Sequence, residues 1–341
     1  MLPSRAFGRF IGRRLIALVI LAVGIVFVTF VLTHMVPANP ALANLGQNPT
    51  PAEIKNFDRV NGLDKPLPVQ LGLYFVHLVQ GNLGTSEVTS DPIIHDLGQT
   101  IPATAELAIL SILIALVFGV GFGLLAALRR NSFTDFVLRI LSLVGVSVPT
   151  FWLALIALYL LFFKLGIFPG GSRLSPSDVA PPRVTGMYTV DALLAGQLST
   201  FWDALQHLVL PSIILAAANM GLLTRYTRSA VLEVMEQDYV RAARAKGLSR
   251  RSIVFGHVLR AALPSIVTVI GLAFANVLTG AVLVENIFSW PGIGQYGYQA
   301  SVALDLPAIA GVSLFIAVVY IVINFIVDVL YGVLDPRVRV Q

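Results

Sequence analysis

The side chains that could carry chemistry in this chain are few, and they are scattered along the sequence. There is no cysteine, and the histidines show neither a His-Glu-x-x-His pair nor another metal-ligand spacing. No Gly-x-Ser-x-Gly nucleophile motif is present. We therefore expect no catalytic residue, no metal site and no cofactor bound by this chain. The five histidines are His34, His77, His95, His207 and His257.

Two glycine patterns bear on nucleotide binding. The P-loop pattern Gly-x-x-x-x-Gly-Lys-[Ser/Thr] is absent, so the chain has no P-loop to hold ATP phosphates. Gly292, Gly294 and Gly297 do match Gly-x-Gly-x-x-Gly, but a dinucleotide site also needs a preceding strand and an acidic residue about 20 residues later. Here the pattern follows an apolar run and Trp290-Pro291, without that acid. We predict a tight re-entrant loop instead.

The composition indicates that membrane-spanning segments position these residues. Hydrophobic residues make up 56% of the 341, charged residues only 12%, and the mean hydropathy is +0.82. An ordinary soluble domain has about 25% charged residues. Pro149 interrupts the third apolar run, which predicts a kink or an interfacial lead-in, and the fourth run is expected to continue as one helix past Arg225. The six predicted spans are residues 15–35, 105–128, 138–163, 208–223, 264–284 and 307–330.

The positive charges predict how these spans are oriented. Six spans place both termini on one side, and 17 of the 23 lysines and arginines fall on that side. The positive-inside rule therefore predicts cytoplasmic termini, and it accounts for the basic pI of about 9.6 without nucleic acid. An alternative is a secretory signal with a cleavage site near residues 41–43. The first apolar stretch has about 20 residues, whereas a signal core has about 7–15, so an uncleaved span is favoured.

Two outer segments connect the spans. Residues 36–103 are turn-rich but contain an amphipathic stretch with Leu71, Phe75, Leu78 and Val79 at helical spacing, which predicts a helix on the membrane surface or on other spans. The second, residues 164–207, is rich in Gly, Pro and Ser, and we expect it to be only partly ordered. Neither is large enough for an enzyme domain with its own core.

Six polar residues lie in or beside the predicted spans. The residues near span ends could be solvated, could pack helices together or could contact the substrate. The three central asparagines could line a pathway or form hydrogen bonds between helices. The end group is Glu106, Glu285 and Asp328, and the central group is Asn219, Asn276 and Asn324.

A basic, alanine-rich segment at residues 238–264 separates the fourth and fifth apolar runs. Its first part predicts a short helix that ends at Gly247, and Ser249 is suited to cap a second helix before Leu263-Pro264 starts the fifth span. Small side chains at Ala242 and Ala243 would let another surface approach closely. The segment is thus typical of a docking element, and equally of an ordinary basic cytoplasmic loop.

A resemblance to a known family favours the docking element over an ordinary basic loop. The spacing of Ala242, Ala243, Gly247 and Leu263-Pro264 resembles the EAA loop of permease subunits in bacterial ATP-binding-cassette (ABC) importers. Arg241 stands where that motif has glutamate, and the glycine-to-proline gap is about one turn longer; both departures are found in the dipeptide/oligopeptide (peptide/nickel) branch. The segments "GLDKPLPVQ", "GNLGTS", "TIPATAELA", "VPTFWLAL", "ENIFSWPGIG" and "DVLYGVLDPRVR" are similar to its B-type permeases, in the same order.

The resemblance implies an all-α integral membrane protein with the type I importer permease fold, in the bacterial plasma (inner) membrane. It divides the chain into a cytoplasmic N-terminus and first span (1–35), an outer loop (36–103), a core of five spans (104–335) with the coupling segment (238–264), and a cytoplasmic tail (336–341). The implied ATPase-coupling residues are Tyr239, Arg241, Ala242, Ala243, Lys246, Gly247, Leu248 and Ser249. The implied outer gate is Glu285, Phe288, Pro291, Gly292 and Gly294.

The resemblance also implies partners. These are a second homologous permease, two ABC ATPase subunits or a fused ATPase that bind ATP and Mg²⁺, an extracytoplasmic substrate-binding protein, and a peptide cargo. The resemblance is specific to the family and not to one substrate, since members carry dipeptides, longer peptides, nickel complexes or haem-like cargo. A secondary transporter would instead need coupling charges near the midplane, and a membrane enzyme a convergent nucleophile or metal set; the sequence shows neither.

Overall fold

The computed structural model describes residues 5–35 and 49–334, and its regular elements in those ranges are all helices. Five helices are long and apolar enough to cross a membrane, and a bent pair makes a sixth span if the pair is counted as one. The predicted all-α architecture is confirmed, and the six predicted spans are present when the bent pair is counted as one span. The five are α1 (Arg5–Met35), α5 (Ile93–Leu128), α9 (Leu198–Met235), α14 (Leu306–Leu334) and a continuous helix, Arg250–Ile287.

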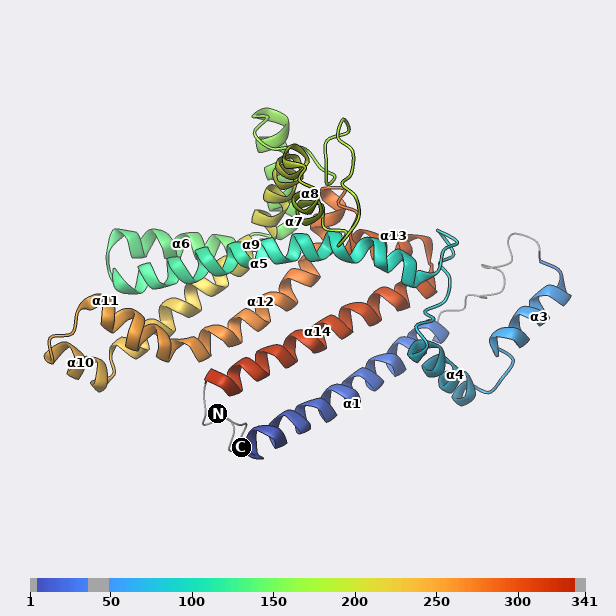
Figure 1. Ribbon diagram of the computed structural model, residues 1–341, viewed down its shortest axis with the longest axis horizontal. Helices are drawn as coiled ribbons and strands as arrows, with labels where there is room; N and C mark the ends of the chain where they lie inside the picture. The colour runs from blue at the N-terminus through green and yellow to red at the C-terminus, as the bar shows by residue number, and fades with distance from the viewer. Residues whose placement is uncertain (1–4, 36–48, 335–341) are drawn as a thin grey trace.

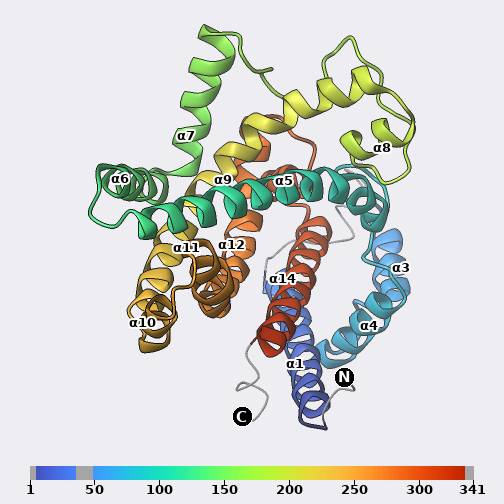
Figure 2. The same cartoon turned by 60° about the vertical axis from the view of Figure 1, so that its left-hand side comes forward.

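The third span is broken rather than kinked. It consists of α6 (Phe133–Ser147), α7 (Thr150–Ala157) and the π-helical segment η1 (Leu158–Lys164), with a bend of 103° between the two halves. Pro149 explains the break, because a proline disfavours helical backbone in the preceding residue, and Val148 is extended with ψ of 125°. Figure 2 shows α7 leaving α6 at a steep angle.

The fifth span begins earlier than predicted. Residues 250–287 form one helix composed of α11 (Arg250–Ser252), the π-helical segment η2 (Ile253–Val258) and α12 (Leu259–Ile287). The expectation that Pro264 would start the span is wrong, because this proline lies inside α12. Membrane helices tolerate such prolines where neighbouring groups satisfy the freed backbone positions. The fourth span, in contrast, is the single long helix α9 that the sequence predicts.

Glycines bring the central helices into close contact. At Gly123 of α5 an added Cβ would lie 2.7 Å from the Thr224 carbonyl oxygen of α9, and at Gly119 it would lie 2.7 Å from Cβ of Leu223. Small residues of this kind let membrane helices pack backbone to backbone. The α5–α9 pair is thus the centre of the bundle, and α6 and α12 pack against α9.

The first and last helices form a separate layer. α1 packs along α14, and Arg14 pairs with Asp328 at 3.2 Å, so the beginning of α1 and the end of α14 lie at the same end of the molecule. Between positions 12 and 31, most side chains of α1 are exposed and apolar, as expected for a helix that faces lipid; Val19 and Ile20 are 63% and 68% exposed. Because Asp328 pairs with Arg14 of α1, it acts in helix packing, which was one of the alternatives considered for it.

The outer segments contain more structure than predicted. The amphipathic helix is present as α4 (Leu67–Val79), but α3 (Pro51–Asn61) was not predicted, although Thr50 and Glu53 form a complete capping box before it. The expectation that residues 164–207 would be partly disordered is wrong. This segment includes α8 (Tyr188–Leu194) and buries Arg173 and Asp191, which form hydrogen bonds with α5 and with backbone groups of the segment itself. The 41–43 site and the 336–341 tail lie outside the described residues.

Candidate functional site

The basic segment forms the helix-turn-helix that its sequence predicts. α10 (Asp238–Ala245) is followed by Gly247, whose φ of +77° lies in the left-handed region that favours glycine. Ser249 then caps α11, with its hydroxyl accepting a hydrogen bond from the Ser252 N–H at 3.3 Å. Figure 1 shows α10 and α11 at one end of the bundle, while α13 (Ile293–Ala303), α3 and α4 lie towards the other.

The neighbouring alanines Ala242 and Ala243 of α10 differ in burial. Ala243 is buried together with Val240 against the bundle, whereas Ala242 is exposed. Tyr239, Ala242 and Lys246 are spaced three and four residues apart and form one exposed face. Of the predicted coupling residues, Ala243 alone is buried; Arg241, Gly247, Leu248 and Ser249 are exposed as well.

The buried side of α10 joins three spans. Val240 and Ala243 belong to one apolar cluster with Ala127 of α5, Val231 of α9 and residues of η2 and α12. The exposed face of α10 is thus connected to the ends of α5, α9 and α12 through packed side chains. This is a mechanical connection and contains no group suited to covalent chemistry.

At the opposite end, Glu285 of α12 organises the short loop between α12 and α13. The prediction of a tight re-entrant loop is wrong for Gly294 and Gly297, because both lie inside α13. The Glu285 side chain is fully buried and accepts hydrogen bonds from the Thr104 hydroxyl at 2.6 Å and from the Gln295 N–H at 3.0 Å. Gly292 lies against this carboxylate, and at Gly294 an added Cβ would lie 2.6 Å from Cα of Val282. Glycine is required at both positions because the neighbouring atoms leave no space for a Cβ.

Most of the predicted outer-gate residues are buried in or beside the loop, with Glu285 in α12 and Gly294 in α13. Glu285, Phe288, Gly292 and Gly294 are buried, and Pro291 alone is exposed. Trp290 is also buried and donates from its indole N–H to the Ala103 carbonyl at 2.9 Å, which fixes the loop to α5.

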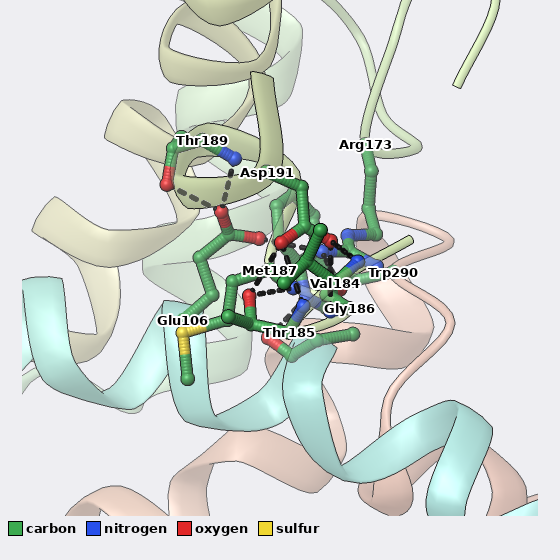
Figure 3. A network of polar contacts seen from close by, with 10 residues as sticks. Glu106, Arg173, Val184, Thr185, Gly186, Met187, Thr189, Asp191 and Trp290 are labelled. Atoms are coloured by element: carbon green, nitrogen blue, oxygen red, sulfur yellow. Dashed lines mark hydrogen bonds and ion pairs between the residues drawn. The ribbon is translucent and has the colours of Figure 1, made fainter. Parts of the chain in front are cut away.

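A buried ion pair fastens the second outer segment over this loop (Figure 3). Arg173 donates to Glu106 of α5 at 2.7 Å and to the Gly186 carbonyl at 2.8 Å. Its guanidinium lies 3.6 Å from the ring centroid of Tyr188 and 5.7 Å from that of Trp290. Both partners of the pair are about 5% exposed, so Glu106 has a packing role in the N-terminal half of α5.

Asp191 organises the turn next to this pair. Its carboxylate accepts hydrogen bonds from the backbone N–H groups of Val184, Thr185 and Gly186 and from the Thr185 hydroxyl, at 2.7–3.2 Å. Burial by itself raises the pKa of Asp191, but these hydrogen bonds outweigh it and the pKa is lowered. Sequence reasoning missed Arg173 and Asp191, because isolated polar residues in a Gly/Pro-rich segment carry no spacing signal.

The central asparagines do not come together as one lining. Asn276 donates to the Asn219 side chain at 3.3 Å across the α9–α12 contact, and Asn219 donates to the Leu215 carbonyl. Asn324 donates to the Tyr320 carbonyl of its own helix. Asn219 and Asn276 thus form the interhelical hydrogen bond that was one of the two alternatives for them.

Within residues 5–35 and 49–334, one group of side chains has the types and spacing of metal ligands. Asp91, His95 and Asp96, at the start of α5, have ligand atoms within 4.8 Å of one another. Asp96 already accepts hydrogen bonds from Thr89 and Tyr296, and the positive end of the α5 dipole disfavours a cation. We attach no site to this group.

Comparison with known proteins identifies the class of this membrane protein. A sequence profile described as "Binding-protein-dependent transport system inner membrane component" matches residues 119–340, and the profile for the N-terminal part of such components matches residues 7–108. The chain belongs to this family. It is a multi-pass permease of the inner membrane, as its apolar helices indicate.

Curated relatives match the permease over nearly its whole length. It is 39% identical to the dipeptide transport system permease protein DppB of Alkalihalophilus pseudofirmus, with 96% of this chain and 98% of the relative covered. It is 41% identical to the probable D,D-dipeptide transport system permease protein DdpB of Escherichia coli (97% and 98% covered) and to the di/tripeptide transport system permease protein DppB of Pseudomonas aeruginosa (97% and 99%). The resemblance to the peptide branch is therefore confirmed.

A solved structure supports the fold. The inward-facing MetNI methionine ABC transporter includes a chain that superimposes with a TM-score of 0.51 at 16% identity, covering 70% of the permease and 96% of that chain. The shared fold is that of an ABC importer permease.

Proposed function

We propose that this permease forms half of the translocation pathway of an ATP-driven importer for dipeptides and other short peptides. The support is the identity of 36–41% to relatives named for dipeptide, D,D-dipeptide or di/tripeptide transport, over more than nine-tenths of the chain. Selection of the cargo would rest largely on a separate binding protein, which delivers it to the outer end of the pathway.

The importer would contain this permease and three other kinds of subunit. A second homologous permease completes the pathway, two cytoplasmic ATPase subunits or a fused ATPase bind ATP and Mg²⁺, and an extracytoplasmic binding protein supplies the peptide. Both termini and α10 face the cytoplasm, where the excess of lysine and arginine is expected. The absence of a P-loop pattern from the sequence supports ATP binding by the partners.

The coupling step uses the two faces of α10. The face with Tyr239, Ala242 and Lys246 sits in a groove of one ATPase, and the small Ala242 side chain allows close approach. ATP-driven closure of the ATPase pair moves α10, and the cluster around Val240 and Ala243 transmits the movement to α5, α9 and α12. The peptide must bind the two access states differently, because otherwise it shifts no population.

The outer end closes through the loop held by Glu285. Movement of α12 carries Phe288 and Gly292 with it, because both belong to the turn that follows this helix. Of the central asparagines, Asn276 is the one that we assign to the pathway between the two permeases, because it is the exposed member of the Asn219–Asn276 pair.

The identity to the peptide-transport relatives is the observation that carries this proposal, and uptake in proteoliposomes tests it. Vesicles containing the complete importer and its binding protein should accumulate a labelled dipeptide with internal ATP, and should not do so with an ion gradient alone. Uptake by this chain alone, driven by an ion gradient, would contradict the proposal and favour a secondary transporter.

A further inference from the structure

A small basic groove lies between α6 and α9, towards the end of the bundle that carries α10. The groove has a volume of about 260 Å³, and its charged lining residues are Arg139, Arg225 and Arg228. It lies outside the coupling segment and outside the loop held by Glu285. The remaining lining residues are Ser142, Leu143, Val146, Gly221, Thr224 and Ser229.

The packing of the two helices explains the groove. They cross with backbones in contact, since an added Cβ at Gly145 would lie 2.8 Å from the Ala217 carbonyl oxygen and one at Gly221 would lie 2.5 Å from that of Ser142. Nearer the α10 end, Arg228 and Asp135 tie the helices together again through two hydrogen bonds of 2.7 and 2.9 Å. The groove lies between these two contacts.

The charges of the groove are not balanced within the described chain. Asp135 is engaged by Arg228 and lies 3.7 Å from Arg139, so a single carboxylate is shared by two of the three guanidinium groups. Arg225 is exposed, and its guanidinium makes no ion pair or hydrogen bond with any residue that the structure describes; it lies 5.5 Å from the Tyr226 ring centroid. The groove is therefore suited to an anion.

The lining changes character along the groove. Arg139, Leu143 and Val146 are four and three residues apart and share one face of α6, with the arginine nearest the α10 end. Leu143 and Val146 are 59% and 43% exposed, so the positive charge is followed towards the bilayer interior by open apolar surface. Arg225 lies just beyond the apolar run that ends at Leu223, at the depth expected for headgroups.

We propose that this groove binds the phosphate of an anionic phospholipid from the cytoplasmic leaflet, with an acyl chain along Leu143 and Val146. Basic pockets between membrane helices on the cytoplasmic side suit such headgroups. A drug-sized ligand usually needs about 300–1,000 Å³, so the groove fits a phosphate group better than a peptide. The inference uses the membrane orientation proposed above and does not depend on the transported cargo.

Native mass spectrometry of the delipidated full-length chain, titrated with phosphatidylglycerol or phosphatidylcholine, tests this inference. The wild type should bind phosphatidylglycerol in preference, and Arg225→Gln should weaken that binding about five-fold, the effect expected from one basic residue near a membrane surface. Arg129→Gln is the matched control, because Arg129 is an exposed cytoplasmic arginine outside the groove. Arg225 is exposed, so its replacement should leave folding intact.

Two further measurements distinguish a lipid phosphate from inorganic phosphate. Leu143→Gln should weaken phosphatidylglycerol binding while inorganic phosphate fails to compete in the wild type. Equal binding of both lipids, equal binding by wild type and Arg225→Gln, or full competition by inorganic phosphate would overturn the inference. Loss of the lipid on adding the second permease would also overturn it, since the groove would then belong to the permease interface.

Discussion

At the scale of single residues, the loop between α12 and α13 depends on the missing side chain of Gly292. A Cβ at this position would collide with the Glu285 carboxylate and the Thr104 hydroxyl. We predict that Gly292→Ala lowers the free energy of unfolding by about 1–3 kcal/mol, the usual cost of overpacking, and also lowers peptide uptake. Denaturant unfolding in detergent measures the first effect. Gly72→Ala is the control, since a Cβ at Gly72 meets nothing within 4 Å; equal behaviour of the two variants would contradict the account.

Asp191 gives a prediction for pH dependence. Because hydrogen bonds lower its pKa in the folded protein, its stabilising effect is fully present above the ordinary carboxyl pKa of about 3.9 and is lost as pH falls through the lowered value. The melting temperature of the wild type should therefore exceed that of Asp191→Asn at about pH 6, and the difference should shrink below about pH 4. Asp178→Asn, an exposed aspartate of the same segment, should show no such trend. A constant difference across this range would refute the assignment.

At the scale of elements, the outer segment is held on α5 by the buried Arg173–Glu106 pair. Removing one partner of a buried pair leaves the other charge uncompensated and typically costs about 3–5 kcal/mol. We expect Arg173→Met and Glu106→Gln each to destabilise the permease strongly, and the double variant to lose much less than the sum. The exposed Arg130–Glu236 pair, at 2.8 Å, is the control and should contribute less than about 1 kcal/mol. Additive losses at Arg173 and Glu106 would show that the two groups act independently.

The helices show which structural features could be predicted from sequence. Hydropathy located the long spans, and Gly247 and Ser249 located the turn after α10, because these signals are local. The directions of Ala242 and Ala243 could not be predicted in the same way, since which side of a short helix is buried depends on the ends of α5, α9 and α12. The sharp bend at Pro149 exceeded the predicted kink because proline permits a break, while tertiary packing sets its angle.

At the scale of the whole molecule, the family could be predicted from motif order, whereas the buried polar network could not. Arg173 meets Glu106 across 67 positions of sequence, and Arg228 meets Asp135 across 93. No periodicity of one segment reports such pairs, because each forms only after the helices have packed. The capping box before α3 was a local signal that sequence reasoning passed over.

The orientation of the chain in the membrane gives a further prediction. The protein has no cysteine, so single cysteines report accessibility without background. Ser177→Cys, in the second outer segment, should react with an impermeant maleimide in intact cells, and Arg251→Cys, beside α10, should react only after permeabilisation; both positions are exposed. The reverse pattern would contradict cytoplasmic termini.

The most direct test of the central claim is recovery of an ATPase with this permease from its native membrane, comparing wild type with Ala242→Asp. A charged side chain at the centre of the exposed face of α10 should disrupt docking while leaving the fold intact, whereas Ala242→Ser should behave like the wild type. We predict that wild type and Ala242→Ser co-purify with ATPase subunits and a second permease, and that Ala242→Asp loses the ATPase but keeps the second permease. Equal ATPase recovery with all three chains, or none with the wild type, would contradict the account.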